Sequence, residues 1–187
     1  FANVGVRLVS CVGRSCAAAR NAGAAASSGR VLCFVDADTI VPDNAVGRIV
    51  TLHEEEGRCL VLYRLASREP GIRAWLWWTF WGLARLLPLA RAKSMPAFMS
   101  CDRTHFERYG PFNASWLIAE EWPLTGAAYR FHNERFLYDR SLTARTSSRR
   151  MELQPFGYAR TFVKWVSVIL FPWARTSLND RIRHQAG

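Results

Sequence analysis

A continuous apolar run sets the strongest limit on the fold of this chain. Residues 31–35 read Val-Leu-Cys-Phe-Val, and two carboxylates, Asp36 and Asp38, follow directly with one alanine between them. An apolar run of this length is typical of a buried strand with both faces covered, as in a parallel sheet. The sequence therefore predicts a central strand that ends in an acidic pair.

The spacing of Asp36 and Asp38 indicates a shared ligand. Residues two apart in an extended chain point to the same side. Open α/β sheets bind ligands at the carboxyl ends of their strands, where such a pair would hold a divalent cation that carries phosphates. The alternative is that the strand simply ends in a solvated acidic turn. This alternative stays open because short motifs such as Asp-x-Asp often occur by chance.

Length and composition favour one globular domain with an unusual charge. The 187 residues are 50% hydrophobic, which excludes general disorder. The five cysteines form no CxxC pair, which favours core thiols in a reducing compartment over a disulfide framework or a zinc site. The net charge of +10 indicates a polyanionic partner or surface. No nucleic-acid-binding motif is present, so nucleic acid is not the expected partner.

Two aromatic stretches, residues 72–90 and 161–174, predict contact with a membrane surface. Both mix tryptophan with basic residues and proline, and neither reaches the roughly 20 uninterrupted apolar residues of a spanning helix. Such composition suits helices at the level of the lipid headgroups. The first stretch has an alternative reading as an ordinary buried helix. We therefore expect a main domain over residues 1–150, a membrane-proximal amphipathic segment over 151–187, and a cytoplasmic protein peripheral to the inner face of the membrane.

The order of the elements predicts an α/β fold. Residues 4–10 alternate as a strand, and Ser15 begins a helix that runs to about residue 28. A helix from Pro42 and a strand over 58–64 follow the acidic strand, which gives a βαβαβ order and a mostly parallel, doubly wound sheet. The second half adds a strand at 97–101, a helix that starts at Pro123, and extended pieces at 135–138 and 142–145.

The motifs, in this order, resemble the family 2 glycosyltransferases, whose fold is named GT-A. The resemblance spans roughly residues 4–150. The motifs that carry it are Gly13-Arg14-Ser15, Ala19-Arg20-Asn21-Ala22-Gly23, Phe34-Val35-Asp36-Ala37-Asp38, Phe98 to Asn113 (similar to a strand, a basic pair and "F…GGFD"), Ala119-Glu120-Glu121 (similar to "ED") and Thr146-Ser147-Ser148-Arg149-Arg150.

The resemblance implies a nucleotide-sugar donor and a divalent metal. Asp38, with Asp36 nearer the ribose, would hold Mn²⁺ or Mg²⁺ against the developing phosphate charge. Arg20 would face the nucleotide, and Asn21 would shape the turn and the helix packing beside it. A cation beside the diphosphate is what the departure of this leaving group requires.

The resemblance also implies an inverting displacement with a carboxylate base. Glu121 aligns with the base of the family, and Glu120 is the neighbour that can substitute for it. Arg149 and Arg150 would clamp a diphosphate or a lipid phosphate, or else form a basic patch near the membrane. The expected enzyme is of the hexosyltransferase type, acts on a glycan or lipid-linked acceptor, and belongs to the synthesis of cell-envelope polysaccharide.

The first strand–helix–strand of the family has no counterpart before residue 4. We therefore expect the chain to be the N-terminally truncated part of a longer enzyme, with unpaired strand edges. In two further departures, Glu121 replaces the commoner aspartate, and Asp102 replaces the first member of the basic pair.

Two other functions account for part of the same sequence. Asp36 and Asp38 also fit the motif of haloacid-dehalogenase-like phosphatases, as nucleophile and general acid/base, but that motif normally lies on the first strand. A non-catalytic basic module that binds membranes would explain the charge and the tryptophans, but not the ordered acidic motifs.

Overall fold

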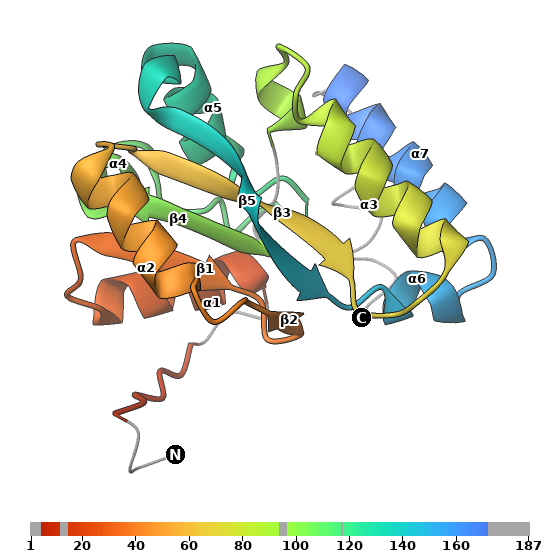
Figure 1. The fold of residues 1–187 in the computed structure, drawn as a ribbon, viewed down its shortest axis with the longest axis horizontal. Coiled ribbons are helices and arrows are strands. Elements are labelled where there is room, and N and C mark those ends of the chain that lie inside the picture. Colours follow the sequence, from red (N-terminus) through yellow and green to blue (C-terminus); the bar gives the residue numbers. More distant parts are fainter. Residues whose placement is uncertain (1–4, 12–14, 94–96, 117, 172–187) are drawn as a thin grey trace.

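The computed structural model describes residues 5–11, 15–93, 97–116 and 118–171, which form a five-stranded sheet flanked by helices (Figure 1). The strands are β1 (Val31–Val35), β2 (Thr39–Ile40), β3 (Leu60–Ser67), β4 (Phe98–Asp102) and β5 (Phe136–Thr146). The α-helices are α1 (Cys16–Ala26), α2 (Ala45–Val50), α3 (Ile72–Ala84), α4 (Arg103–Tyr109), α5 (Trp122–Phe131), α6 (Arg149–Leu153) and α7 (Gly157–Leu170). A π-helical turn, η2 (Thr51–Glu55), continues α2, and two short 3₁₀ turns are η3 (Ala90–Ala92) and η4 (Asn133–Arg135).

The sheet is mixed, with the strand order β1-β4-β3-β5-β2. β4 is antiparallel to both β1 and β3, β5 is parallel to β3, and β2 is antiparallel to β5. β1, β3 and β5 therefore share one direction, while β4 and β2 run the opposite way. The predicted α/β class is confirmed. The expected run of neighbouring parallel strands is interrupted because β4, from later in the chain, lies between β1 and β3.

The strand expected over residues 4–10 is not found in its described part. Residues 5–10 have no strand conformation, and Val6 and Leu8 are 61% and 93% exposed. Alternation of apolar residues yields a strand only where a partner offers backbone hydrogen bonds. β1 is an edge strand, and its outer edge pairs with no strand among the described residues.

Two apolar layers hold the helices against the sheet. On one face, α1, α4 and α5 pack on β1, β3 and β4 through Phe34, Leu62, Phe106 and Leu124. On the other face, α2 and η2 cover β3 and β5. The polar groups that follow β1 therefore emerge from a well-packed core, which fixes their position.

α3 and α7 lie side by side at one end of the sheet (Figure 1). The ring of Trp81 contacts that of Trp165, with 6.2 Å between their centres, and Val168 of α7 is buried against Ile118 and Ala119. α7 ends at residue 170, so the part of the expected stretch 161–174 beyond residue 171 lies outside the described residues. No helix in the described ranges is long and apolar enough to cross a bilayer. The boundary expected at residue 150 stays a prediction.

Candidate functional site

Arg20 joins acidic residues from the two halves of the chain. Its guanidinium donates to Asp36 Oδ1 at 2.5 Å and to Glu120 Oε1 at 2.7 Å. Arg20 lies on α1, Asp36 follows β1, and Glu120 precedes α5. The side chains of Arg20 and Glu120 are only 11% and 12% exposed. Three segments that are distant in sequence therefore meet at one largely buried charged centre.

The charges at this centre compensate one another. Burial alone lowers the pKa of Arg20, but the charges and hydrogen bonds of Asp36 and Glu120 more than offset it, so the pKa lies above its ordinary value. The guanidinium carbon also lies 5.5 Å from the centre of the Phe112 ring, within reach of a cation–π contact. Arg20 is therefore a fixed cation held among a ring and two carboxylates.

α1 carries a second polar residue that holds the later segment in place. Asn21 Nδ2 donates to the carbonyl of Phe112 at 2.8 Å, and the Phe112 amide donates to Asn21 Oδ1 at 2.9 Å. The helix itself begins at Ser15, whose hydroxyl accepts from the Ala18 amide at 3.1 Å. Asn21 thus acts on the backbone of residue 112, and this contact supports the packing role expected for it.

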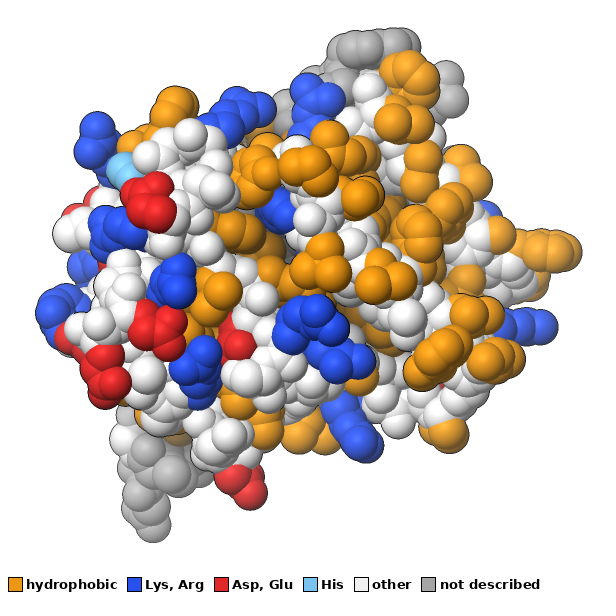
Figure 2. Space-filling view, turned by 45° about the horizontal axis from the view of Figure 1, so that its top comes forward, with side chains coloured by type: hydrophobic (Ala, Val, Ile, Leu, Met, Phe, Trp, Pro, Cys, Tyr) orange, Lys and Arg blue, Asp and Glu red, His pale blue; other side chains and the backbone are white. Residues whose placement is uncertain are grey.

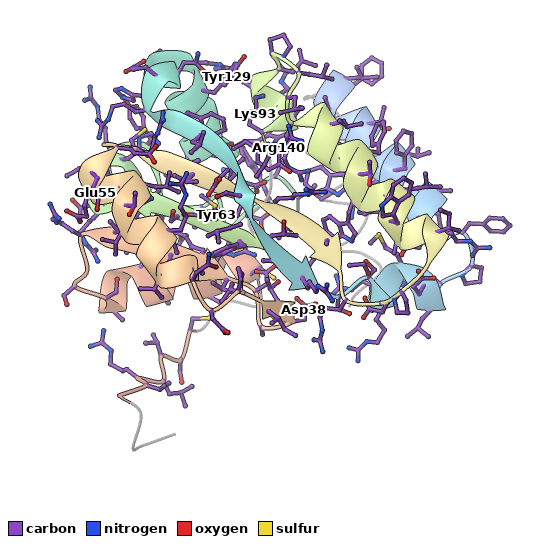
Figure 3. All side chains as sticks on the ribbon, in the orientation of Figure 1. Asp38, Glu55, Tyr63, Lys93, Tyr129 and Arg140 are labelled. Carbon is purple, nitrogen blue, oxygen red and sulfur yellow. The ribbon has the colours of Figure 1, made fainter. Side chains whose placement is uncertain are left out.

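Asp36 and Asp38 do not lie on one extended strand. The amide of Thr39 donates to the carbonyl of Asp36 at 2.9 Å, which closes a tight turn directly after β1. Asp38 is exposed and accepts from the Thr146 hydroxyl at 3.4 Å, near the end of β5 (Figure 3). The premise that the chain stays extended through Asp38 was wrong, because β1 ends at Val35 and a turn follows it. The two residues instead serve different contacts.

The carboxylates fit a cation that is shared with a substrate. Within the described ranges, no group of three or more His, Cys, Asp or Glu residues is placed to hold a metal ion. Asp36 is engaged by Arg20, whereas Asp38 is exposed and has only a long contact with a hydroxyl. Mg²⁺ is commonly bound by one or two carboxylates together with substrate phosphates. The donor set therefore suits a metal that arrives with a diphosphate.

The two adjacent glutamates have different surroundings. Glu120 faces Arg20, whereas Glu121 is 0% exposed and lies at the N-cap position of α5, where its side chain makes no capping hydrogen bond. Ala119, just before them, has a left-handed backbone with φ of 60°, a conformation that costs a non-glycine residue on the order of 1 kcal/mol. The buried bond from the Asn113 amide to the Glu120 carbonyl, at 2.9 Å, helps to hold this turn. Strain of this kind is commonly found at functional sites.

A cavity of about 170 Å³ opens beside Asp36. Its walls are mainly apolar and come largely from α3 and α7, with charged groups at Asp36, Arg85 and Arg91. Burial lowers the pKa of Arg85 to about 10, and the charges of Tyr138 and Glu121 offset part of that effect. The tryptophans that line the cavity are Trp77, Trp78, Trp81 and Trp165. Apolar walls with a few polar groups are typical of a small-molecule site.

The Arg149–Arg150 pair lies at the start of α6 and is exposed. The turn before it is tied down by Glu69, which accepts from the Ser148 amide at 2.6 Å and from the Ser147 hydroxyl at 2.7 Å. Ser148 Oγ also accepts from Trp78 Nε1 at 3.0 Å. The basic pair is therefore connected to the cavity wall through Trp78, but neither arginine lines the cavity.

Sequence reasoning missed several residues of this site. It assigned no site role to Arg85, Arg91 or Phe112. For the two arginines the sequence did carry a signal, namely a charge in or next to an aromatic stretch. An arginine in such a place must find a partner or line a cavity.

Comparisons with known proteins bear on the family and the fold. A family model described as Glycosyl transferase family 2 matches residues 2–107. The fold is similar to the crystal structure of glucosyl-3-phosphoglycerate synthase from Mycobacterium tuberculosis in complex with phosphoglyceric acid, with a TM-score of 0.53 and 20% sequence identity. That match covers 90% of this chain and 57% of the other, so this chain spans little more than half the length of that enzyme. A search of curated proteins found no significant match.

The fold and the family model lead to one assignment. The sheet and its helices match a GT-A glycosyltransferase, and the family model covers more than half of the chain. The chain therefore belongs to the family 2 glycosyltransferases.

Proposed function

We propose that this chain carries the catalytic centre for transfer of a sugar from a nucleotide-sugar donor to an acceptor hydroxyl, with inversion and with a divalent metal. The observation that carries the proposal is the bridge from Arg20 to Asp36 and Glu120, which brings the donor half and the acceptor half to one centre. Membership of the family supports a transferase over the phosphatase that the Asp36–Asp38 motif also allowed.

On the donor side, Asp38 and Asp36 hold the cation, and Arg20 orients the carboxylate of Asp36. When bound, Mn²⁺ or Mg²⁺ neutralises charge on the departing diphosphate. Arg20 is rigid because each of its two terminal nitrogens is paired with a carboxylate and its guanidinium group lies over the Phe112 ring. It therefore supplies a positive charge without reorganisation. Arg149 and Arg150 are exposed and remain candidates for a diphosphate or a lipid phosphate.

On the acceptor side, the cavity beside Asp36 holds the group that receives the sugar. The acceptor oxygen attacks the anomeric carbon as the bond to the diphosphate breaks, and a carboxylate takes the proton of the hydroxyl. Glu120 serves as this base, because its carboxylate reaches the Arg20–Asp36 centre. Glu121, which the family alignment favours, is fully buried, and its charge acts on Arg85 in the cavity wall.

The surface of α3 and α7 fits a peripheral contact with a membrane. Figure 2 shows hydrophobic side chains gathered at this end of the molecule. The large apolar side chains on α3 that are at least 46% exposed are Ile72, Trp75, Leu76, Phe80 and Leu83. An apolar face of this size marks an interaction site. The proposal has three further parts. The acceptor is a lipid-linked or glycan acceptor of cell-envelope polysaccharide, the transferred sugar is a hexose, and the contact is with the cytoplasmic face of the membrane.

The test is donor binding and turnover by the whole 187-residue chain. A panel of nucleoside diphosphates is added with and without Mn²⁺, and the melting temperature is measured together with release of nucleoside diphosphate from nucleotide sugars. One nucleotide is expected to raise the melting temperature only with Mn²⁺, and chelation is expected to abolish release.

Asp38→Ala provides the site-directed form of the test, with Glu55→Gln as the matched loss of one exposed carboxylate on η2, far from Asp38 (Figure 3). Asp38→Ala should remove the Mn²⁺-dependent shift, while Glu55→Gln retains it. Equal behaviour of the two variants, or turnover that persists without metal, would contradict the assigned donor site.

A further inference from the structure

A second cavity, about 390 Å³ in volume, lies on the other side of Trp78 from Asp36. It is bounded by α3 and by the β3–β5 pair, and Leu65 and Trp78 line both cavities. Its lining does not include Asp36, Arg20, Glu120 or Glu121. It therefore contains none of the residues to which a role in the transfer is given above.

The two sides of this cavity differ in chemistry. The α3 side carries Trp75, Leu83 and Leu86, which are 60%, 59% and 52% exposed. The sheet side carries Arg64 and Arg140, both exposed; Figure 3 shows Arg140 on β5 beside α3. An occupant would therefore meet apolar surface on one side and two guanidinium groups on the other.

The charge balance of the cavity is positive. Among the described residues, neither Arg64 nor Arg140 forms an ion pair. Glu69 is the only carboxylate in the lining, and both of its oxygens are taken by the turn at Ser147 and Ser148. The guanidinium groups are thus available for an anion, which arginine binds through two parallel hydrogen bonds.

We propose that this cavity binds the phosphate headgroup of an anionic membrane lipid. The lipid is favoured because the apolar residues that line the cavity are continuous with the exposed apolar surface of α3, so a headgroup can reach Arg64 and Arg140 while its acyl chains stay along the helix. The inference deepens the membrane contact proposed above and rests on it. It adds a defined headgroup site one side chain away from the cavity beside Asp36.

The test is sedimentation of the full chain with vesicles of neutral phosphatidylcholine, with and without phosphatidylglycerol. The variant Arg64→Gln/Arg140→Gln removes the site. The control Arg73→Gln/Arg160→Gln removes the same charge from exposed positions of α3 and α7 that do not line the cavity. Every surface arginine also attracts anionic lipid in a general way, so the control subtracts that effect.

The expected result is stronger binding to the anionic vesicles, with a loss in the cavity variant about tenfold larger than in the control. Arg64→Lys/Arg140→Lys should recover part of the binding, since lysine keeps the charge but not the paired hydrogen bonds. Equal losses in the two glutamine variants, or full recovery with lysine, would overturn the headgroup site. Binding to neither vesicle would overturn it too. None of these readouts depends on glycosyl transfer, so failure of the transferase proposal is measured separately.

Discussion

Glu120 and Glu121 are neighbours in sequence with different physical situations. Glu120 pairs with Arg20 at 2.7 Å, whereas Glu121 is fully buried, and its charge offsets part of the lowering of the Arg85 pKa that burial causes. Removing one member of a buried charge pair leaves the other charge uncompensated. The two glutamates should therefore respond differently to the same isosteric substitution.

We predict that Glu120→Gln lowers kcat by about 10²- to 10⁴-fold, the typical contribution of a general base, and also lowers the melting temperature, because Arg20 loses the charge of its partner at 2.7 Å. Glu121→Gln should lower the melting temperature with a smaller effect on kcat, because it changes a fully buried carboxylate whose charge favours the buried Arg85 cation. Steady-state kinetics and thermal unfolding of both variants provide the measurement. If Glu121→Gln folds normally and is the less active of the two, Glu121 is the base, as its alignment with the family motif implies.

At the scale of elements, the turn between β5 and α6 is built around one carboxylate. Hydrogen bonds from the Ser148 amide and the Ser147 hydroxyl lower the pKa of Glu69 to about 2. The same turn receives the indole N–H of Trp78 and precedes Arg149. Order in this turn therefore depends on an ionised Glu69.

This dependence predicts a loss of stability in acid. Since the pKa of Glu69 is lower in the folded chain than in the unfolded chain, its contribution is complete above about pH 4.5 and is lost as the pH falls towards 2. The melting temperature of the wild type should fall more steeply over this range than that of Glu69→Gln. Thermal unfolding followed by tryptophan fluorescence at several pH values measures both. Parallel curves for the two proteins would show that the turn does not rely on this charge.

On the scale of the whole molecule, acidic and apolar surfaces are separated. The acidic side chains lie mainly at the end with α2 and β1, and the apolar surface lies over α3 and α7 (Figure 2). A molecule with its apolar side chains on one side binds a membrane surface in a single orientation. The membrane contact proposed above therefore makes a directional prediction.

Leu76→Glu should weaken binding to vesicles by at least about tenfold, because a buried leucine contributes roughly 1.5–3 kcal/mol. Leu76 lies on α3 and is 54% exposed. Val46→Glu on α2, where the valine is 72% exposed, makes the same change outside the proposed contact and should bind normally. Vesicle sedimentation of the two variants is the measurement. A similar loss for both would mean that added negative charge, and not a particular face, governs binding.

Local signals predicted several elements, but not the burial of β1, which is an edge strand with Cys33 and Val35 exposed and not the buried central strand expected. The apolar run became β1, the hydroxyl of Ser15 caps α1, and Pro123 lies in the first turn of α5, because each depends on neighbours in sequence. The insertion of β4 between β1 and β3 was not predictable in this way, since it depends on pairing between residues such as Cys33 and Ser100.

The candidate site shows the same division. The types of residue were readable, because Arg20, Asp36 and Glu120 stand in ordered motifs. Their geometry was not, because a turn after Val35 separates Asp36 from Asp38, and because Arg20 contacts a residue one hundred positions away. Arg85 was missed since only the folded chain shows that its aromatic segment walls a cavity.

Trp78 forms part of the wall between two cavities and is tethered at its indole nitrogen to Ser148. An occupant that turns this ring in one chamber alters the room left in the other. Linkage then requires reciprocity: whatever factor the first occupant applies to the affinity of the second, the second applies to the first. Under the two proposals above, binding of a lipid headgroup in one cavity would thus change the affinity of the other cavity for an acceptor through the Trp78 indole. The fluorescence of Trp78 would report both binding events.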